Sequence, residues 1–423
     1  MKKSILLSAI LLTSNLLSAQ WVQQNPNYPD TNVLNDLVFF DHSSGWAVGG
    51  YYGSWPIPST NESLHTNNSG LDWNNTWWLG MGSPGQNVFF IDENYGWVCG
   101  GQEILHTTDG GLGFYSWESQ NINLSPQQYL YLVFFIDSLN GWAYSKGGEI
   151  SLDYELFKTT DGGNNWESQL QGHFLQLNDM CFLNESIGYG AGWSEFNYTI
   201  DGGDTWNIVV INMVAMSLDV IDENNIWIAG YDDSEKGIIK SSVDGGLTWN
   251  KKLGDTIQPL KDIIFIDSNI GWAVGDSGTI LHTSDGGNNW EFQESGTSAD
   301  LNSVYFVDEN YGWICGDSSI ILHTDNGGIV GTDQSVQSPG LQVQVYPNPF
   351  SDNINVEFEL NKPSNVSIQI LNNMGTIVWK NNLGIQSCGK NTQHPDIRHL
   401  ASGVYFCKLQ AGDQVAVERL VKL

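Results

Sequence analysis

The octet TTDGGNNW, from Thr159 to Trp166, decides the fold because variants of it recur along the whole chain. Its paired glycines reach positive φ at little cost, and its Asp can accept hydrogen bonds from the backbone amides of the same turn. One occurrence would leave a metal or phosphate site open, but repeated occurrences predict a repeated turn. Further copies end at Trp73, Trp206, Trp249 and Trp290.

Two copies depart from this pattern. The stretch HTTDGGLGFYSW either places Phe114 in the position of the Trp or carries three extra residues before Trp117, and the last copy, HTDNGG, stops at Gly328 without a Trp. The acceptor of the turn is Asn in the first and last copies. That exchange keeps hydrogen-bond acceptance but loses the charge, so we expect a structural role for the acceptor. The acceptor positions are Asn68, Asp109, Asp161, Asp201, Asp244, Asp285 and Asn326.

Each octet follows three further segments in a fixed order: an apolar run such as KDIIFID, a run such as GWAVGD, and a run such as TILHTSD. β-branched and aromatic residues punctuated by Gly, Asn and Asp predict strands. Four strands per unit, a period of about 40 to 49 residues and seven units predict an all-β fold, a seven-bladed β-propeller. The segment Trp21–Gln24 looks like a fourth strand without the three that should precede it. We expect it to complete the seventh unit and close the ring.

The octets resemble the Asp-box, or BNR, repeat, and in combination with segments such as FID and GWAVG they are similar to the propellers of the photosystem II assembly and stability factor family. The resemblance covers residues 20–330 and implies a propeller in which the box is a structural turn. Asp-box propellers host unrelated activities, so the resemblance predicts fold rather than function. Sialidases of this kind grip a carboxylate with three arginines, whereas the only arginines here, Arg398 and Arg419, lie outside the propeller.

Charge is distributed unevenly along the chain. From Pro339 onward there are six of the 47 acidic residues and seven of the 16 basic ones, so the net charge of −31 arises before that point. Such a field repels phosphate backbones, and we expect no nucleic-acid partner. The start of the chain has two lysines and an apolar run ending at Ser18-Ala19, the pattern of a secretory signal cleaved before Gln20. No later apolar run reaches the length of about 20 residues that a membrane helix needs.

The connections between strands divide between two faces of a propeller. The octets lie on a regular face, whereas the links from second to third strand and from unit to unit lie on the other face and vary in length. Loops on a rigid scaffold commonly bind ligands, and exposed rings suit sugar faces and protein surfaces. We predict that this loop face binds a glycan or a protein, and packing between units is the alternative role for the adjacent tryptophan pair. The candidate ligand-binding residues are Tyr51, Tyr52, Trp55, Trp77, Trp78, Tyr129 and Tyr231.

No catalytic residue, metal ligand or cofactor is predicted. Acids are plentiful, but spacing singles out no carboxylate pair of the kind a glycoside hydrolase uses. The cysteines lack zinc-ligand spacing; Cys99 and Cys315 occupy matching repeat positions typical of buried thiols, and pairing of Cys388 with Cys407 is left open. Calcium binding is also left open, because loop carboxylates suit it but form no EF-hand-like series.

After a polar linker the chain changes character, and alternating runs predict a small immunoglobulin-like β-sandwich. This tail resembles the type A C-terminal sorting domain of the type IX secretion system through VYPNPF, NNMGTIV, DIRHLASGVYF and the terminal ERLVKL. The resemblance implies contact with the type IX machinery, passage through the periplasm and delivery across the outer membrane. The positions that carry it are Pro347, Asn348, Pro349, Gly375, Gly403, Tyr405 and Lys422.

These observations predict four segments: a signal peptide (1–19), a propeller (20–330), a linker (331–342) and a sorting domain (343–423). The expected function is a secreted or cell-surface module for binding or adhesion that is not an enzyme. An extracellular polysaccharide hydrolase is the first alternative, and a surface-protein assembly factor is the second.

Overall fold

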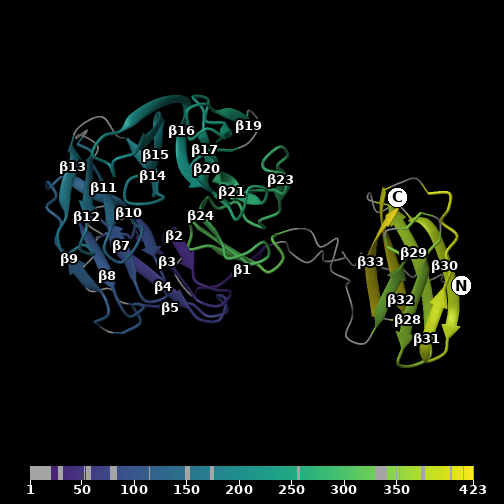
Figure 1. Cartoon of the computed structure of the whole chain (residues 1–423). Helices are drawn as coiled ribbons and strands as arrows, with labels where there is room; N and C mark the ends of the chain where they lie inside the picture. Colours follow the sequence, from purple (N-terminus) through teal and green to yellow (C-terminus); the bar gives the residue numbers. More distant parts are fainter. Residues whose placement is uncertain are drawn as a thin grey trace, which may run out of the picture. The chain divides into compact units, whose positions relative to one another are not determined.

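The computed structural model describes the chain except for residues 1–20, 27–31, 52, 54–58, 77–82, 114, 148–152, 172–175, 255–257, 329–340, 349, 352, 373–376, 401–402, 413 and 423. The described part consists of β-strands and one short 3-10 turn, η1 (Asp276–Gly278). It forms two compact units, residues 1–328 and 329–423 (Figure 1). Within the described part there is no helix whose length and apolarity suit a membrane crossing.

The first three repeat units each form a four-stranded antiparallel sheet in which neighbouring strands are consecutive in sequence. The first contains β2 (Val33–Phe39), β3 (Gly45–Tyr51), β4 (Thr60–Thr66) and β5 (Asn74–Asn75). The second contains β6 (Asn87–Phe90), β7 (Gly96–Gly100), β8 (Glu103–Thr107) and β9 (Glu118–Gln120). The third contains β10 (Gln128–Phe135), β11 (Gly141–Gly147), β12 (Glu155–Thr159) and β13 (Glu167–Gln171).

The fourth and fifth units share one six-stranded sheet, because two long strands run across the expected turns. Ser194 and Asn212, both at positive φ, lie within these strands where we expected a hairpin and a link between units. Because two of the units share one sheet, the count of seven blades stays a prediction from the sequence repeat. The strands are β14 (Leu177–Phe182), β15 (Gly188–Thr199), β16 (Asn207–Val220), β17 (Ile226–Tyr231), β18 (Gly237–Ser242) and β19 (Asn250–Gly254).

The last two units are again four-stranded sheets. The sixth contains β20 (Leu260–Phe265), β21 (Gly271–Gly275), β22 (Thr279–Thr283) and β23 (Glu291–Gln293). The seventh contains β24 (Leu301–Phe306), β25 (Gly312–Gly316) and β26 (Ile321–Thr324), and its fourth strand is β1 (Val22–Gln24) from the other end of the propeller. Val22 pairs with His323 and Gln24 with Ile321. The closure predicted from the missing Trp is therefore confirmed.

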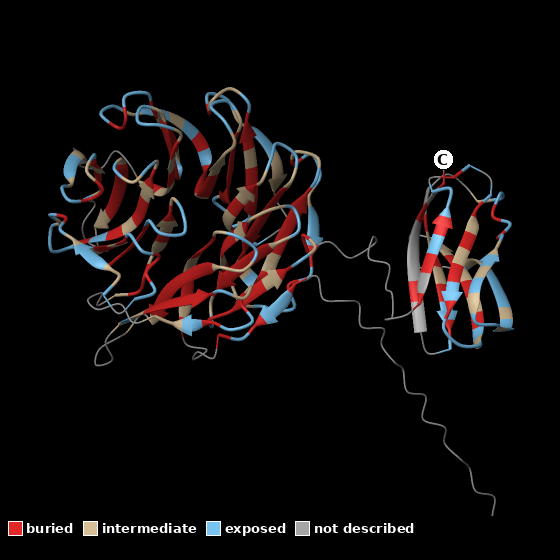
Figure 2. Ribbon diagram, turned by 60° about the horizontal axis from the view of Figure 1, so that its bottom comes forward, coloured by how far each residue is buried: buried red, intermediate tan, exposed pale blue. Residues whose placement is uncertain are grey.

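The sheets surround a central axis, with the first strand of each unit innermost and the fourth outermost (Figure 1). The core lies between neighbouring sheets, where the Trp of the second strand stacks on a Phe of the next unit's first strand, as in Trp97 on Phe135 at 3.6 Å between ring centroids. The octet Trp166 approaches the same Phe135 edge-on at 5.8 Å. Figure 2 shows buried residues along the strands and exposed residues in the loops. Each Phe is thus held between two tryptophans, which locks one unit to the next.

The octets are tight turns. Asp161 Oδ1 accepts the backbone N–H of Asn165 at 2.9 Å and the hydroxyl of Thr159 at 2.9 Å, while Gly162 and Gly163 have φ of 73° and 87°. Asn68 makes the corresponding contacts, with its Oδ1 2.9 Å from the N of Asp72. The charge of the acceptor is therefore not needed for the turn.

The second octet carries an insertion, which resolves the alternative left open by its sequence. Trp117 packs edge-on against Phe90 at 5.9 Å, as four other octet tryptophans do against a Phe of their own first strands. Phe114 lies outside the described residues.

The C-terminal unit is a sandwich of two antiparallel sheets around its own core. The three-stranded sheet has the order β27-β28-β31 and the four-stranded sheet the order β30-β29-β32-β33. Cys407 is buried in the core, Cys388 is exposed, and both are free thiols, so the disulfide that the sequence left open is not formed. The strands are β27 (Gln342–Tyr346), β28 (Asn355–Leu360), β29 (Ser364–Asn372), β30 (Ile377–Gln386), β31 (Gly389–Gln393), β32 (Gly403–Ala411) and β33 (Gln414–Lys422).

Candidate functional site

Strand register identifies the two faces of the propeller. The start of β10 pairs with the end of β11, as Tyr129 does with Lys146, so the beginning of each first strand and the end of each second strand lie at one face. The octets lie at the other face, where the amide of Gly162 donates to the carbonyl of Leu139 in the turn between first and second strands. We call the former the loop face and the latter the octet face.

A cavity of about 320 Å3 lies between the loop-face ends of the seven first strands. Each strand contributes two successive residues, which form two stacked rings. The ring nearer the loop face consists of Asn35, Gln86, Tyr131, Asn178, Met216, Lys261 and Asn302. The second ring consists of Asp36, Asn87, Leu132, Asp179, Ser217, Asp262 and Ser303.

Polar side chains of the second ring form hydrogen bonds between neighbouring units, except at the third unit, which has Leu132 in this position. Asp179 Oδ2 accepts the backbone N–H of Leu218 at 2.9 Å, and Asp262 Oδ2 accepts that of Val304 at 2.8 Å. Between the last and first units, the Ser303 hydroxyl donates to Asp36 Oδ1 at 2.9 Å. These carboxyl groups therefore position neighbouring strands.

The aspartates of the second ring are half-buried, and desolvation of their carboxyl groups raises their pKa values. Desolvation raises the pKa of Asp179 and of Asp262 to about 7, although the backbone N–H donors act in the opposite direction. The pKa of Asp36 is raised for the same reason. The cavity wall is therefore partly protonated near neutral pH.

The asparagines of the first ring reinforce this pattern through their amide groups. Asn35 Nδ2 donates to the carbonyl of Gly85 at 2.6 Å, and Asn178 Nδ2 donates to that of Ala215 at 2.8 Å. Asn302 Nδ2 likewise donates to the carbonyl of Leu34 at 2.9 Å. Each acceptor carbonyl belongs to the residue directly before the first-ring residue of the next unit. An Asn-Asp pair therefore holds the first strand of the next unit at two points: the Asn binds a backbone C=O and the Asp binds a backbone N–H. We call this pair of contacts the Asn-Asp clasp.

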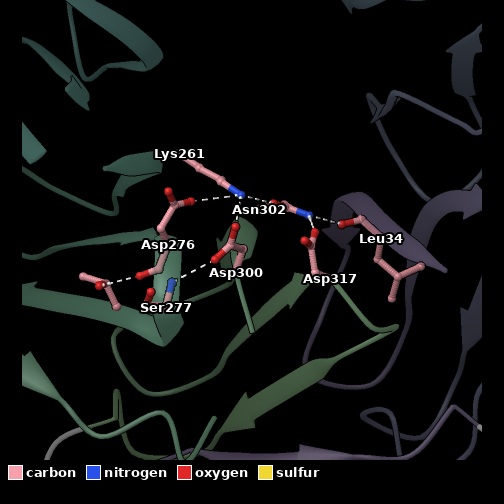
Figure 3. Close-up of polar contacts among 8 residues, drawn as sticks. Leu34, Lys261, Asp276, Ser277, Asp300, Asn302 and Asp317 are labelled. Atoms are coloured by element: carbon pink, nitrogen blue, oxygen red, sulfur yellow. Dashed lines mark hydrogen bonds and ion pairs between the residues drawn. The ribbon is translucent and has the colours of Figure 1, made fainter. Parts of the chain in front are cut away.

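Lys261 neutralises the acids at one side of the cavity (Figure 3). Its Nζ lies 3.1 Å from Asp276 Oδ1, 3.2 Å from Asp300 Oδ2 and 3.0 Å from Asn302 Oδ1. Figure 3 shows this lysine bridging the sixth and seventh units above the amide of Asn302, which itself reaches Asp317 and Leu34. Its charge is therefore matched by carboxylates.

Lys146 has a different environment. Its Nζ donates to Asn178 Oδ1 at 2.9 Å and lies 3.4 Å from the centroid of the Tyr131 ring. Within the described residues no carboxylate forms an ion pair with it. Burial lowers the pKa of this lysine to about 7. A cation held by an amide and a ring, in a propeller rich in acids, is suited to receive an acceptor from a ligand.

The structure describes three of the predicted ligand-binding residues. Tyr51 and Tyr231 are half-buried at the ends of second strands, and Tyr129 is 49% exposed, two residues before the cavity residue Tyr131. All three lie at the loop face, in the first, fifth and third units. The predictions for Tyr52, Trp55, Trp77 and Trp78 fall outside the described residues.

Two features of this face were missed from the sequence. Trp193 is 59% exposed at the end of a second strand, and both it and Tyr231 pair in register with Val214. Its signal was the Trp of GYGAGW, at a position where five other units have Gly, Lys or Asp and the fifth unit has Tyr231. The Asn-Asp clasp was also missed, although the recurrence of polar pairs inside otherwise apolar strands, as in LNDLVFF and LNDMCF, was visible.

In the sorting region, Tyr405 and Lys422 are buried, and Lys422 Nζ lies 5.1 Å from the ring of Phe350. Pro347 and Asn348 directly follow β27, and Gly403 begins β32. Pro349 and Gly375 lie outside the described residues. Within the described residues no group of three or more His, Cys, Asp or Glu side chains is arranged to hold a metal ion.

Residues 344–423 match the family described as the secretion system C-terminal sorting domain. The tail is a sorting domain of the type IX system. Residues 252–338 match the family of the photosynthesis system II assembly factor YCF48, which contains the BNR repeat. The sorting domain directs the chain to the cell surface or beyond. The resemblances to the sorting domain and to the photosystem II assembly factor family are both confirmed. No curated protein sequence matches this chain.

Solved structures similar to this chain are β-propellers. YCF48 bound to a D1 peptide is 18% identical with a TM-score of 0.56, covering 72% of this chain and 95% of that one. YCF48 from Cyanidioschyzon merolae is 19% identical with a TM-score of 0.54, covering 72% and 98%. PorZ, a surface component of the type IX secretion system of Porphyromonas gingivalis, is 14% identical with a TM-score of 0.52, covering 91% of this chain and 58% of its own. At these identities the likeness establishes the fold alone.

Proposed function

We propose that this protein is a secreted surface propeller that binds a polypeptide at its loop face and performs no catalysis. The observation that carries the proposal is the mixed chemistry at the mouth of the central cavity. An apolar side chain (Leu132), a lysine without a carboxylate partner among the described residues (Lys146) and an exposed ring (Tyr129) lie on the paired strands β10 and β11, and a second apolar side chain, Met216, lines the cavity from β16. Polypeptides offer partners for all of these groups, whereas a neutral glycan would offer no charged group to the lysine and little apolar surface to Leu132 and Met216.

Two further observations support this proposal. The cavity carboxyl groups accept hydrogen bonds from backbone N–H groups of the next unit, so they act in positioning the strands. In addition, a propeller of similar fold, YCF48, has been solved with a peptide bound. The glycan alternative at the same face becomes an outcome of the test below.

Replacing both Tyr129 and Trp193 by Ala should weaken peptide binding at least about tenfold, because exposed aromatic anchors commonly dominate binding energy. Peptides selected from a random display library against the full chain would be titrated calorimetrically against wild type and variant. Phe292→Ala is the control, since Phe292 is also an exposed aromatic residue, at 66%, but belongs to the outer strand of the sixth unit. Selection of no peptide, or equal affinity of all variants, contradicts the proposal; binding of oligosaccharides instead, weakened by the same variants, favours the glycan alternative.

An extracellular polysaccharide hydrolase is the second candidate. Asp179 and Asp262 line one cavity, and burial raises the pKa of each to about 7, which is a value suited to a general acid. A reducing-sugar assay with the full chain on neutral polysaccharides separates the candidates. Activity lost in Asp262→Asn would favour the hydrolase, and its absence from wild type would favour the binding module.

Export should depend on the sorting domain. Deleting residues 343–423 is expected to leave the propeller in the periplasm, because the match to the sorting family lies in this tail. Cell fractionation with immunoblotting of periplasm, outer membrane and medium measures the effect, and Trp193→Ala, a surface change in the propeller, is the control. Undiminished surface delivery of the truncated chain would contradict this assignment.

A further inference from the structure

A second cavity, of about 420 Å3, lies against the octet of the third unit. It falls within the range of about 300–1,000 Å3 typical of small-ligand pockets. Five carboxamides line it, together with the half-buried Trp166. The carboxamide residues are Asn121, Asn123, Asn164, Asn165 and Gln169.

The third and sixth units have nearly the same sequence here, DGGNNWESQ and DGGNNWEFQ, yet their final glutamines differ in role. Gln293 of the sixth unit is buried and clasps the seventh unit: its Nε2 donates to the carbonyl of Gly327 at 2.9 Å, and its Oε1 accepts from the indole of Trp21 at 2.9 Å. Gln24 makes the corresponding bonds to Ser69 and Trp73 in the first unit. This glutamine is therefore an inter-unit clasp elsewhere in the ring.

In the third unit the clasp is replaced by a lysine. The carbonyl of Gly202, which corresponds to that of Gly327, accepts from Lys158 Nζ at 3.4 Å and from the indole of Trp142 at 3.0 Å. Lys158 occupies the position that is His282 in the sixth unit, directly before the octet threonine. A bulge in β13 between the pairs Leu156–Leu170 and Phe157–Ser168 places Gln169 out of the register in which Gln293 faces Ile280. Gln169 lines the cavity instead, and its buried Oε1 has no hydrogen-bond partner among the described residues.

The other carboxamides are also directed at the cavity. Ile122 is buried in the core, which turns its neighbours Asn121 and Asn123 outward, and both are exposed. Asn164 and Asn165 donate their amide N–H groups to Asp161, at 2.6 and 2.7 Å, which fixes their side chains and orients their carbonyl oxygens. The cavity thus presents paired donors and acceptors on a rigid frame.

We infer that this cavity binds a neutral saccharide, a function separate from the proposed loop-face binding. Carboxamides donate and accept at once and carry no charge, which matches vicinal hydroxyl groups, and Trp166 supplies an aromatic surface for sugar C–H faces. The two charged side chains that line it outside the octet turn, Lys158 and Glu167, are of opposite sign. A phosphate or a polyuronate would find one lysine in a strongly acidic propeller and is the poorer fit.

The test uses the full chain in calorimetric titrations with cellohexaose, laminarihexaose and N-acetylchitohexaose as neutral probes and an oligogalacturonate as the anionic one. Asn164→Ala should weaken binding of the neutral probe at least about tenfold, since it removes a fixed hydrogen-bonding group. Asn288→Ala in the sixth unit is the matched control, because Asn288 makes the same bond to its octet Asp at 2.7 Å, and it should leave affinity unchanged. Equal melting temperatures of the two variants would show that the fold is retained.

A second variant tests the glutamine itself. Gln169→Ala removes a carboxamide that lines the cavity and should weaken saccharide binding without loss of stability, because the Oε1 of Gln169 has no hydrogen-bond partner among the described residues. The loop-face double variant of Tyr129 and Trp193 should bind saccharide as wild type does, which separates this inference from the proposed function. The inference is overturned if no neutral probe binds at millimolar concentration, if only oligogalacturonate binds, or if Asn164→Ala and Asn288→Ala weaken binding equally.

Discussion

Trp21→Ala should lower the free energy of unfolding by about 4 kcal/mol, in the range of buried Trp-to-Ala changes. Trp21 is buried, meets the ring of Phe306 edge-on at 5.8 Å and donates its indole N–H to Gln293. The substitution removes this packing, leaves a buried glutamine oxygen unpaired and loosens the strand that closes the ring. Thermal denaturation of the propeller should show a midpoint lower by about 6–10 °C.

Trp193→Ala is the control for this prediction, because it removes the same side chain from an exposed position. Its effect on stability should stay within about 0.5 kcal/mol, as is usual for surface substitutions. Equal midpoints for the two variants would mean that β1 contributes little to closure. The comparison therefore measures the energetic value of joining the N-terminal strand to the last unit.

Stability should fall as the pH rises from about 5 to 7, because carboxyls of the second cavity ring hold their protons in the folded state. Burial raises the pKa of Asp179 and of Asp262 to about 7, whereas the unfolded chain releases these protons near pH 4. The stabilisation is fully present below the unfolded pKa and is lost as the pH rises through the folded pKa. A shift of this size corresponds to about 2 kcal/mol per carboxyl between pH 5 and pH 7.

Asp179→Asn isolates this effect, and Asn is the residue that the second unit has at this position. Buried histidines such as His282, whose pKa burial lowers, oppose the trend below pH 6.5, but they are present in wild type and variant alike. Denaturant titrations at pH 5, 6 and 7 measure the free energy of unfolding of both proteins. As the pH rises, the value for wild type should fall by about 2 kcal/mol relative to the value for the variant. A constant difference would mean that Asp179 titrates normally.

Most of the propeller was predictable because its turns and strands carry local signals. Paired glycines with an Asx acceptor specify the octet turn, and the missing Trp after Gly328 pointed to Trp21 as the closing residue. The merging of the fourth and fifth units was not predictable. It depends on β15 and β16 continuing past an irregularity at Ser194 and Asn212, on either side of which Trp193 pairs with Val214 and Glu195 with Val210. The sequence contains no turn motif that marks this point.

The candidate sites were predictable only in part. The loop face was identified from loop lengths, and Tyr129 and Tyr231 lie on it, but the cavity residues come from two successive positions in each of seven units. These residues meet because the units form a ring. The sequence repeat predicts the ring but not which side chains meet at its centre. The sequence shows a Trp at position 193 but not that its side chain is exposed. Its exposure depends on the pairing of β14 with β15, which ends at Gly192.

The sequence by itself determined the repeated turn, the strand order, the closing strand and the sorting tail, since each rests on contacts within a short stretch or on a recurring pattern. Only the tertiary structure revealed that two nearly identical stretches of sequence make different contacts. Gln169 and Gln293 follow nearly identical octets, but one lines a cavity and the other clasps its neighbour. The difference arises from strand register: a bulge in β13 moves Gln169 out of the alignment that places Gln293 opposite Ile280, so only Gln293 meets the carbonyl of the adjoining unit.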